Sequence, residues 1–117
     1  MDYTESILNS IKKMLGPSAE YTHFDPDIIM HINSAFADLN RIGVGPSEGF
    51  NINDSSAKWT DFVSDISKIE NIKTYVYLNV KLVFDPPTNS SILSSYERKI
   101  DKLEWALNVA ADNSSEV

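Results

Sequence analysis

The apolar positions of this chain recur at helical spacings over most of its length. The first such segment covers residues 3–15, and a Gly-Pro pair ends it, because proline cannot continue a helix. The second covers residues 25–42, with Asp25 as the expected N-cap and Pro26 as the first helical residue. A broad apolar stripe follows Pro26, and Gly43 closes the segment. The pattern predicts two amphipathic helices here.

Residues 43–53 break the helical pattern. Three glycines and a proline in eleven residues preclude a regular helix. The segment still carries Val44, Phe50 and Ile52, so we expect it to fold back on the body. The triplet Asp54-Ser55-Ser56 then indicates the cap of a short helical turn that carries Trp59, Phe62 and Val63.

Residues 66–84 are ambiguous between helix and strand. Their apolar residues follow the helical period, yet residues 75–84 are rich in side chains that favour strands. Length favours a helix, because a strand of this length would be exceptional. The pair Pro86-Pro87 is a hard stop, since two prolines cannot sit inside a helix.

The fourth segment starts near Thr88 or Asn89 and runs to about Ala111. Its apolar residues alternate steps of three and four, which is the seam of a helix that packs along another helix: Leu93, Tyr96, Ile100, Leu103, Leu107 and Ala110. Residues 112–117 form a polar tail that we expect to be disordered in an isolated subunit.

These segments together predict an all-α fold. We expect a small bundle of about four main helices, with an irregular loop between the second and third and a flexible C-terminal tail. The predicted domain covers residues 1–111, and the tail covers residues 112–117.

Composition adds limits to this picture. A chain of 117 residues with 42% hydrophobic content fits one compact domain. The absence of cysteine excludes disulfides and thiolate metal sites. The N-terminus is acidic and polar, unlike a signal peptide, and the longest apolar-rich stretch is too short to cross a bilayer. We expect a soluble protein with no membrane contact.

The net charge of −7 bears on nucleic acids. Residues 1–65 carry ten acidic and four basic side chains. Nucleic-acid affinity comes largely from Lys and Arg that displace counterions, so this chain is a poor candidate for gripping phosphates. The same charge suits a surface along which DNA slides without sticking, although it is equally typical of a protein that is merely soluble.

Candidate chemistry is sparse. The glycine-rich residues 43–49 lack the Gly-Lys-Ser/Thr of a phosphate loop and follow a helix instead of a strand. Two histidines and two aspartates suggest a metal site: His23, Asp25, Asp27 and His31. Acidic residues in the first turn of a helix are, however, ordinary partners of the helix dipole, and we favour a capped helix without a metal. Trp59 and Trp105 lack interleaved basic residues, so we expect them to be anchors in the core or at an interface. A platform on which the bases of a single-stranded nucleic acid stack would need such basic residues. No reaction can be assembled, so we expect no enzyme and no cofactor.

Five short sequence motifs follow one another along the chain: Ile29-Met30-His31-Ile32-Asn33-Ser34, Gly43-Val44-Gly45-Pro46-Ser47-Glu48-Gly49-Phe50, Lys73-Thr74-Tyr75-Val76-Tyr77-Leu78, Leu82-Val83-Phe84-Asp85-Pro86-Pro87 and Leu103-Glu104-Trp105-Ala106-Leu107-Asn108. In these motifs the chain resembles the head-tail connectors, or adaptors, of siphophages that infect Gram-positive hosts. The resemblance that they carry spans about residues 3–111. None of the motifs is catalytic.

The resemblance implies an all-α fold, with residues 66–84 helical, and a structural role in the virion. It implies a homo-oligomeric ring, typically of twelve subunits, that is assembled in the host cytoplasm and seated beneath the portal protein. Such a ring extends the channel for double-stranded DNA, which passes without specific binding. It also offers a platform for the stopper, the next neck protein.

The resemblance also suggests two contact regions. In such rings the C-terminal helix and tail commonly dock on the portal, which here would involve Asn108, Val109, Ala110, Ala111, Asp112 and Val117. The loop at residues 43–53 would contact a neighbouring subunit or the downstream neck through Val44, Pro46, Glu48, Phe50 and Ile52.

The main alternative is a DNA-binding packaging factor, such as a small terminase-like subunit. It should show a basic helix in a helix-turn-helix pair. The candidates here carry Lys12, Lys13 and Arg41 among more numerous acids, which argues against it. A host-directed regulatory protein is a third reading, without positive support in the sequence.

Overall fold

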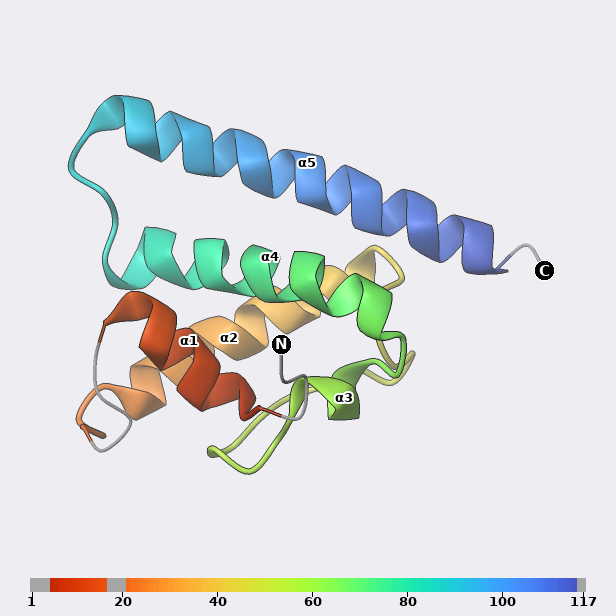
Figure 1. Cartoon of the computed structure of the whole chain (residues 1–117), viewed down its shortest axis with the longest axis horizontal. Coiled ribbons are helices and arrows are strands. Elements are labelled where there is room, and N and C mark those ends of the chain that lie inside the picture. Colours follow the sequence, from red (N-terminus) through yellow and green to blue (C-terminus); the bar gives the residue numbers. More distant parts are fainter. Residues whose placement is uncertain (1–4, 17–20, 116–117) are drawn as a thin grey trace.

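The computed structural model describes residues 5–16 and 21–115, and it is helical over most of that length (Figure 1). The described part contains five helices and no strand: α1 (Ile7–Leu15), α2 (Asp25–Arg41), α3 (Trp59–Phe62), α4 (Ile66–Phe84) and α5 (Ser90–Ser115). Four of them are of substantial length, which confirms the predicted all-α bundle.

Helix α4 is the centre of the molecule. It lies between α5 on one side and α1 and α2 on the other (Figure 1). Its residues Ile69, Ile72, Tyr75, Val76 and Val80 are completely buried. A helix with apolar residues on several faces needs neighbours on several sides. The burial that these neighbours provide outweighs the strand preference of the sequence, and the prediction of a helix over residues 66–84 is confirmed at both ends.

Helix α1 starts later than predicted. Ser6 is its N-cap and accepts a hydrogen bond from the backbone N–H of Asn9 at 3.2 Å. The preceding chain is extended, and the Ile7 N–H donates to the carbonyl of Ala57 at 2.9 Å. This cap, together with the contact with residues 57–58, prevents the helix from reaching back toward Tyr3, which lies outside the described residues.

A buried ion pair joins α1 to the start of α2. The Lys12 Nζ lies 2.8 Å from Asp25 Oδ1 and also donates to the carbonyl of Tyr21 at 2.8 Å. The Lys12 side chain is only 1% exposed. The expected N-cap role of Asp25 is therefore wrong: Phe24 occupies the cap position without a side-chain bond, and the Asp25 carboxylate faces Lys12 instead.

The loop at residues 43–53 folds back on α2, as predicted. The Asn33 side chain brackets Ile52: its Nδ2 donates to the Ile52 carbonyl at 2.9 Å, and its Oδ1 accepts from the Ile52 N–H at 2.8 Å. Farther along α2, Asn40 Nδ2 donates to the Pro46 carbonyl at 2.9 Å. Two amides of one helix thus satisfy backbone groups that the glycine-rich sequence cannot pair by itself.

Gly45 is required at its position in this loop. Its φ of +89° lies in the region that favours glycine. A Cβ added there would clash with the ring of Phe62 and come within 2.6 Å of its Cζ. The backbone at Gly45 therefore packs directly on an aromatic ring of the core.

Helix α3 is capped differently from the prediction. The Lys58 N–H donates to Asp61 Oδ2 at 2.8 Å, while Asp54 accepts from the Ser56 N–H at 2.8 Å in a separate turn. Trp59 is buried, and its Nε1 donates to Ser10 Oγ at 2.9 Å. The short helix thus places the indole of Trp59 in the core, which was one of the two positions predicted for it.

Helix α5 packs along α4 through the predicted seam, where Ile100, Leu103 and Leu107 are buried. Asn89 caps its start by accepting from the Ser91 N–H at 2.8 Å. The predicted end near Ala111 is wrong, because the helix continues to Ser115. The sequence there contains no glycine or proline that would stop a helix.

Candidate docking surfaces

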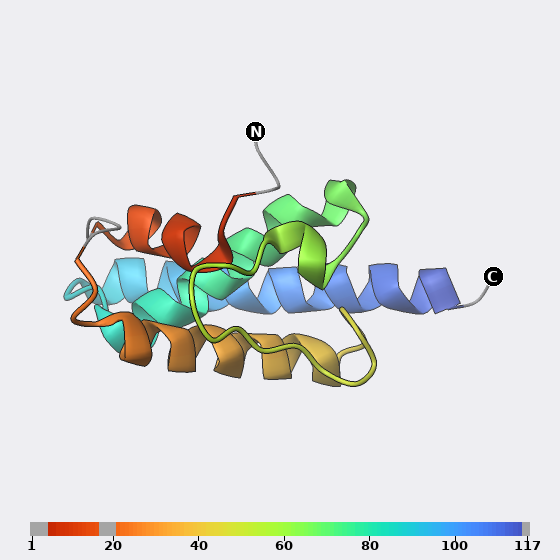
Figure 2. The ribbon, with the colours of Figure 1, turned by 90° about the horizontal axis from the view of Figure 1, so that it is seen from below.

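The C-terminal end of α5 projects beyond the rest of the bundle in both views of the ribbon (Figures 1 and 2). Leu107 is still buried, and Asn108 Nδ2 donates to the carbonyl of Ile42 at 3.0 Å. Val109 is exposed, and Ala110 is half-buried. The side chains of Ala111 and Asp112, and all of Val117, lie outside the described residues. The helix thus leaves the bundle within the segment predicted to dock on a partner.

The side of α5 that faces away from α4 carries an exposed tryptophan. Trp105 is 71% exposed, the largest value among the exposed large hydrophobic side chains of the described residues. Exposed residues at helical spacings of four, three and four form one stripe with it, here called the outer face: Arg98, Lys102, Trp105 and Val109. Of the two alternatives foreseen for this tryptophan, core or interface anchor, the core alternative is wrong for Trp105.

The loop predicted to make contacts is largely part of the subunit's own core. Val44 and Ile52 are buried. The ring of Phe50 packs edge-on against Phe36 and Phe62, at 5.2 Å between centroids in each case. Pro46 is half-buried and Glu48 is exposed. Only Pro46 and Glu48, at the tip, remain well placed to meet another molecule.

A partly buried hydrogen bond joins α5 to α4. The Tyr75 Oη donates to Glu104 Oε1 at 2.7 Å. Burial, followed by the hydrogen bond and the negative charge of Glu104, raises the pKa of the Tyr75 phenol. The phenol therefore remains a donor throughout the neutral range.

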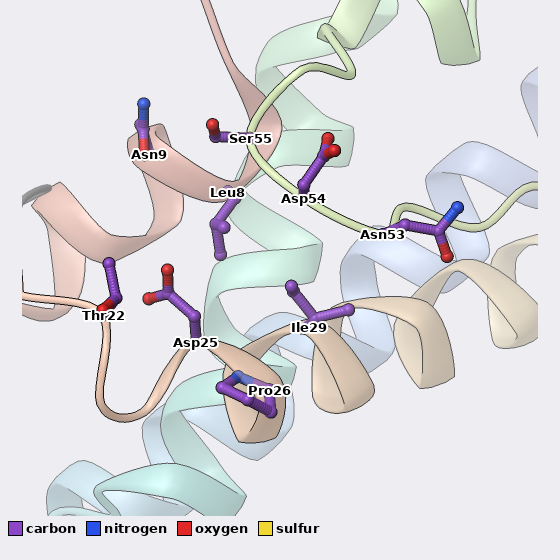
Figure 3. A pocket seen from close by; sticks show the side chains of 9 residues that line it. All are labelled: Leu8, Asn9, Thr22, Asp25, Pro26, Ile29, Asn53, Asp54 and Ser55. Carbon is purple, nitrogen blue, oxygen red and sulfur yellow. The ribbon is translucent and has the colours of Figure 1, made fainter.

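A pocket of about 370 Å³ opens between α1, the start of α2 and residues 53–55 (Figure 3). Leu8, Pro26 and Ile29 provide its apolar side chains. Asn9, Asn53, Ser55 and the carboxylates of Asp25 and Asp54 provide its polar ones. Hydrogen bonds from Ser56 lower the pKa of Asp54, so this carboxylate is ionised at neutral pH. The pocket combines an apolar wall with a negatively charged rim.

A second exposed apolar surface lies where the α1–α2 connection meets the end of α4. Phe24 packs edge-on against Phe84 at 5.5 Å and against Tyr21 at 5.9 Å. Tyr21, Phe24 and Val83 are all exposed. Sequence reasoning missed this cluster, because its members come from segments about sixty residues apart.

The residues considered for a metal behave as separate groups. His23 packs edge-on against Phe24 at 4.9 Å, and Asp25 pairs with Lys12. Among residues 5–16 and 21–115, no three His, Cys, Asp or Glu side chains gather in a way that could hold a metal ion. None of the described helices combines the length and apolar character needed to cross a membrane.

Comparison with known proteins gives one match. A family model described as phage connector protein matches residues 7–114, from the start of α1 to the residue before the end of α5. Neither the curated proteins nor the solved structures contain a match. The matched region covers nearly all of the segment that carries the resemblance noted in the sequence.

Proposed function

This chain belongs to the phage connector protein family, and we propose that it is a head-tail connector, or adaptor, of a siphophage with a Gram-positive host. Its copies assemble in the host cytoplasm into a ring, of twelve subunits by the family resemblance. The ring sits beneath the portal protein of the virion, extends the DNA channel and links the capsid to the stopper.

The observation that carries this proposal is the projecting end of α5. A preformed helix that extends past its own subunit offers backbone and side chains to a partner at a small cost in conformational entropy. Val109 is exposed there, and the segment from Asn108 to Val117 forms the proposed portal contact. The Asn108–Ile42 hydrogen bond holds the base of this projection on the body.

The proposed contact of the 43–53 loop, which begins beside the Asn108–Ile42 hydrogen bond, is smaller than the sequence suggested. Pro46 and Glu48, at the tip of the 43–53 loop, contact the neighbouring subunit or the stopper. Val44, Phe50 and Ile52 support this tip from inside by packing on the core. Their role in assembly is thus to hold the loop in shape.

The charge of the chain is compatible with the proposed DNA channel. The chain carries a net charge of −7, and a wall of such subunits repels the phosphate backbone instead of holding it. Double-stranded DNA therefore passes the ring without specific binding. The connector family is structural, and we propose no reaction and no cofactor for this chain.

The packaging-factor alternative loses support from the placement of its basic residues. Lys12 is buried against Asp25, and Arg41 lies 3.2 Å from Asp38 on α2. Neither forms part of a basic recognition helix.

The test is the molar mass measured by light scattering after size-exclusion chromatography, alone and with the cognate portal. We expect a stoichiometric complex with the portal that contains a ring of twelve times the subunit mass of 13.1 kDa. Truncation after Ala111 should abolish portal binding. The control replaces residues 112–117 by a helical sequence of equal length and charge. This control keeps the length of the segment, so it shows whether the specific side chains or the length are needed for binding. A chain that ignores the portal and binds DNA fragments would instead be a packaging factor.

A further inference from the structure

We infer that Trp105 on the outer face of α5 inserts into the pocket between α1, α2 and residues 53–55 of a second copy of this chain. This contact is the lateral interface between neighbouring subunits. The inference rests on the proposed ring, and it names the two surfaces that meet within it.

The first observation is the exposure of Trp105. An indole that is 71% exposed leaves a large apolar surface in water. Tryptophan is enriched among the few side chains that dominate binding at protein interfaces. Trp59, in contrast, is buried and hydrogen-bonded within the subunit, so the two tryptophans serve different purposes.

The second observation is the position of the pocket on the other side of the molecule. Helix α4 lies between α5 and both α1 and the start of α2, whereas the other end of α2 reaches α5 through the Asn108–Ile42 hydrogen bond (Figures 1 and 2). The outer face points away from α4, so Trp105 cannot reach the pocket of its own subunit. A contact between two different surfaces of identical chains is head-to-tail, and repetition of such a contact closes a ring when the rotation allows it.

The third observation is the fit in size and polarity. A pocket of about 370 Å³ is at the small end of the range of about 300–1,000 Å³ for sites that hold drug-sized molecules, which suits a single indole ring. Leu8, Pro26 and Ile29 can cover the faces of the ring (Figure 3). The indole N–H needs an acceptor when it is buried, and the rim supplies the Asn53 amide and the Asp54 carboxylate.

The fourth observation is complementary charge. Lys102 lies one turn before Trp105 on the outer face, and Arg98 lies two turns before it; both are exposed. The exposed carboxylate of Asp54 stands at the rim of the pocket, and that of Asp27 lies in the first turn of α2 beside Pro26. Opposite charges around an apolar anchor fix the register of an interface and disfavour wrong partners.

The absence of native cysteine permits a direct test by disulfide cross-linking. Two single variants, Trp105→Cys and Ser55→Cys, are mixed, assembled with the cognate portal at a concentration high enough to offset the loss of the indole, and oxidised. We expect a covalent dimer from the mixture and none from either variant alone, because each contact joins two different surfaces. The double variant should give a ladder of covalent oligomers. Val83→Cys, at another exposed apolar position, is the matched control with Ser55→Cys and should give no dimer.

A charge-reversal experiment tests the same pairing without cysteine. Asp54→Lys and Lys102→Glu should each raise the protein concentration required for assembly at least tenfold. The double reversal should restore most of the lost assembly. Reversal of Arg41, which is exposed outside both surfaces, is the control and should leave assembly unchanged.

The outcomes separate this inference from the proposed function. If wild-type copies form the ring but Trp105→Cys and Ser55→Cys do not cross-link, the pairing is wrong and the connector function stands. If Trp105→Cys cross-links with itself, the outer faces meet in a two-fold contact and the pairing is also wrong. If wild-type copies form no ring even with the portal, both proposals fall.

Discussion

Helices α4 and α5 lie side by side, and they use their apolar residues in opposite ways. Helix α4 is surrounded by α1, α2 and α5, and its residues Ile69, Ile72 and Val76 are completely buried. Helix α5 buries one seam, while Trp105 and Val109 on its other side are exposed. The comparison teaches that α4 holds the subunit together, whereas α5 leaves two apolar side chains exposed, which we propose to contact a partner. Substitutions in the two helices should therefore separate stability from assembly.

The largest effect on stability is expected in α4. Ile72→Ala removes a completely buried side chain beside two other helices and leaves a cavity, so we expect a loss of about 2–5 kcal/mol in the free energy of unfolding. Urea denaturation followed by circular dichroism measures it. Val83→Ala, at an exposed position of the same helix, should change the value by less than about 0.5 kcal/mol. Equal losses at both positions would contradict the central place of α4.

The next effect is expected at Gly45, where the 43–53 loop packs on the Phe62 ring. Alanine there combines an unfavourable φ with a clash against the Phe62 ring, and we expect a loss of about 2 kcal/mol. Gly49 also has a positive φ, but a Cβ would meet nothing within 4 Å, so Gly49→Ala should cost about half as much. Thermal unfolding of both variants checks the difference. If the two variants lose the same stability, backbone strain alone explains the loss at Gly45 and the clash with Phe62 contributes nothing.

The hydrogen bond between the two helices gives a smaller effect. Tyr75→Phe removes the donor to Glu104, and we expect a loss of about 1.5 kcal/mol. The pKa of Tyr75 is raised in the folded protein, so its contribution is fully present below the unfolded pKa of about 10 and is lost as the pH rises above that value. Between pH 8 and pH 11 the free energy of unfolding should fall more for the wild type than for Tyr75→Phe, as denaturation at the two pH values measures. Parallel declines would contradict the assigned role of the phenol.

The smallest effect on stability should come from the outer face. Trp105→Ala removes an exposed side chain, so the free energy of unfolding of the monomer should change by less than about 0.5 kcal/mol. The protein concentration required for assembly with the portal should nevertheless rise at least tenfold, which light scattering detects. A large loss of stability would mean that Trp105 belongs to the subunit's own core. Intact assembly would remove it from the interface.

The sequence predicted those features that depend on local signals. The bounds of α4 were predictable because its length favours a helix and Pro86-Pro87 stops it. The fold-back of residues 43–53 was predictable because apolar side chains in a glycine-rich segment need cover. The resemblance to phage connectors is confirmed by the match over residues 7–114, and the Gram-positive host stays a prediction.

The features that depend on distant contacts were not predictable. The sequence presents Lys12 only as a basic residue of a possible helix-turn-helix, yet it is buried, because its partner Asp25 approaches from the next helix. Val44 and Ile52 were assigned to an interface, but Asn33 draws their loop onto the core. The pocket is formed by three segments that only the fold brings together. The end of α5 was missed because the sequence lacks a stop signal there.

The most direct test of the central claim is a cryo-electron microscopy reconstruction of the neck of the purified virion. The account predicts a ring of this chain between portal and stopper, with the C-terminal end of α5 against the portal and Trp105 enclosed by the adjacent subunit. A neck that lacks the chain would contradict the connector function itself. A ring in which the end of α5 points away from the portal would contradict the role assigned to that helix.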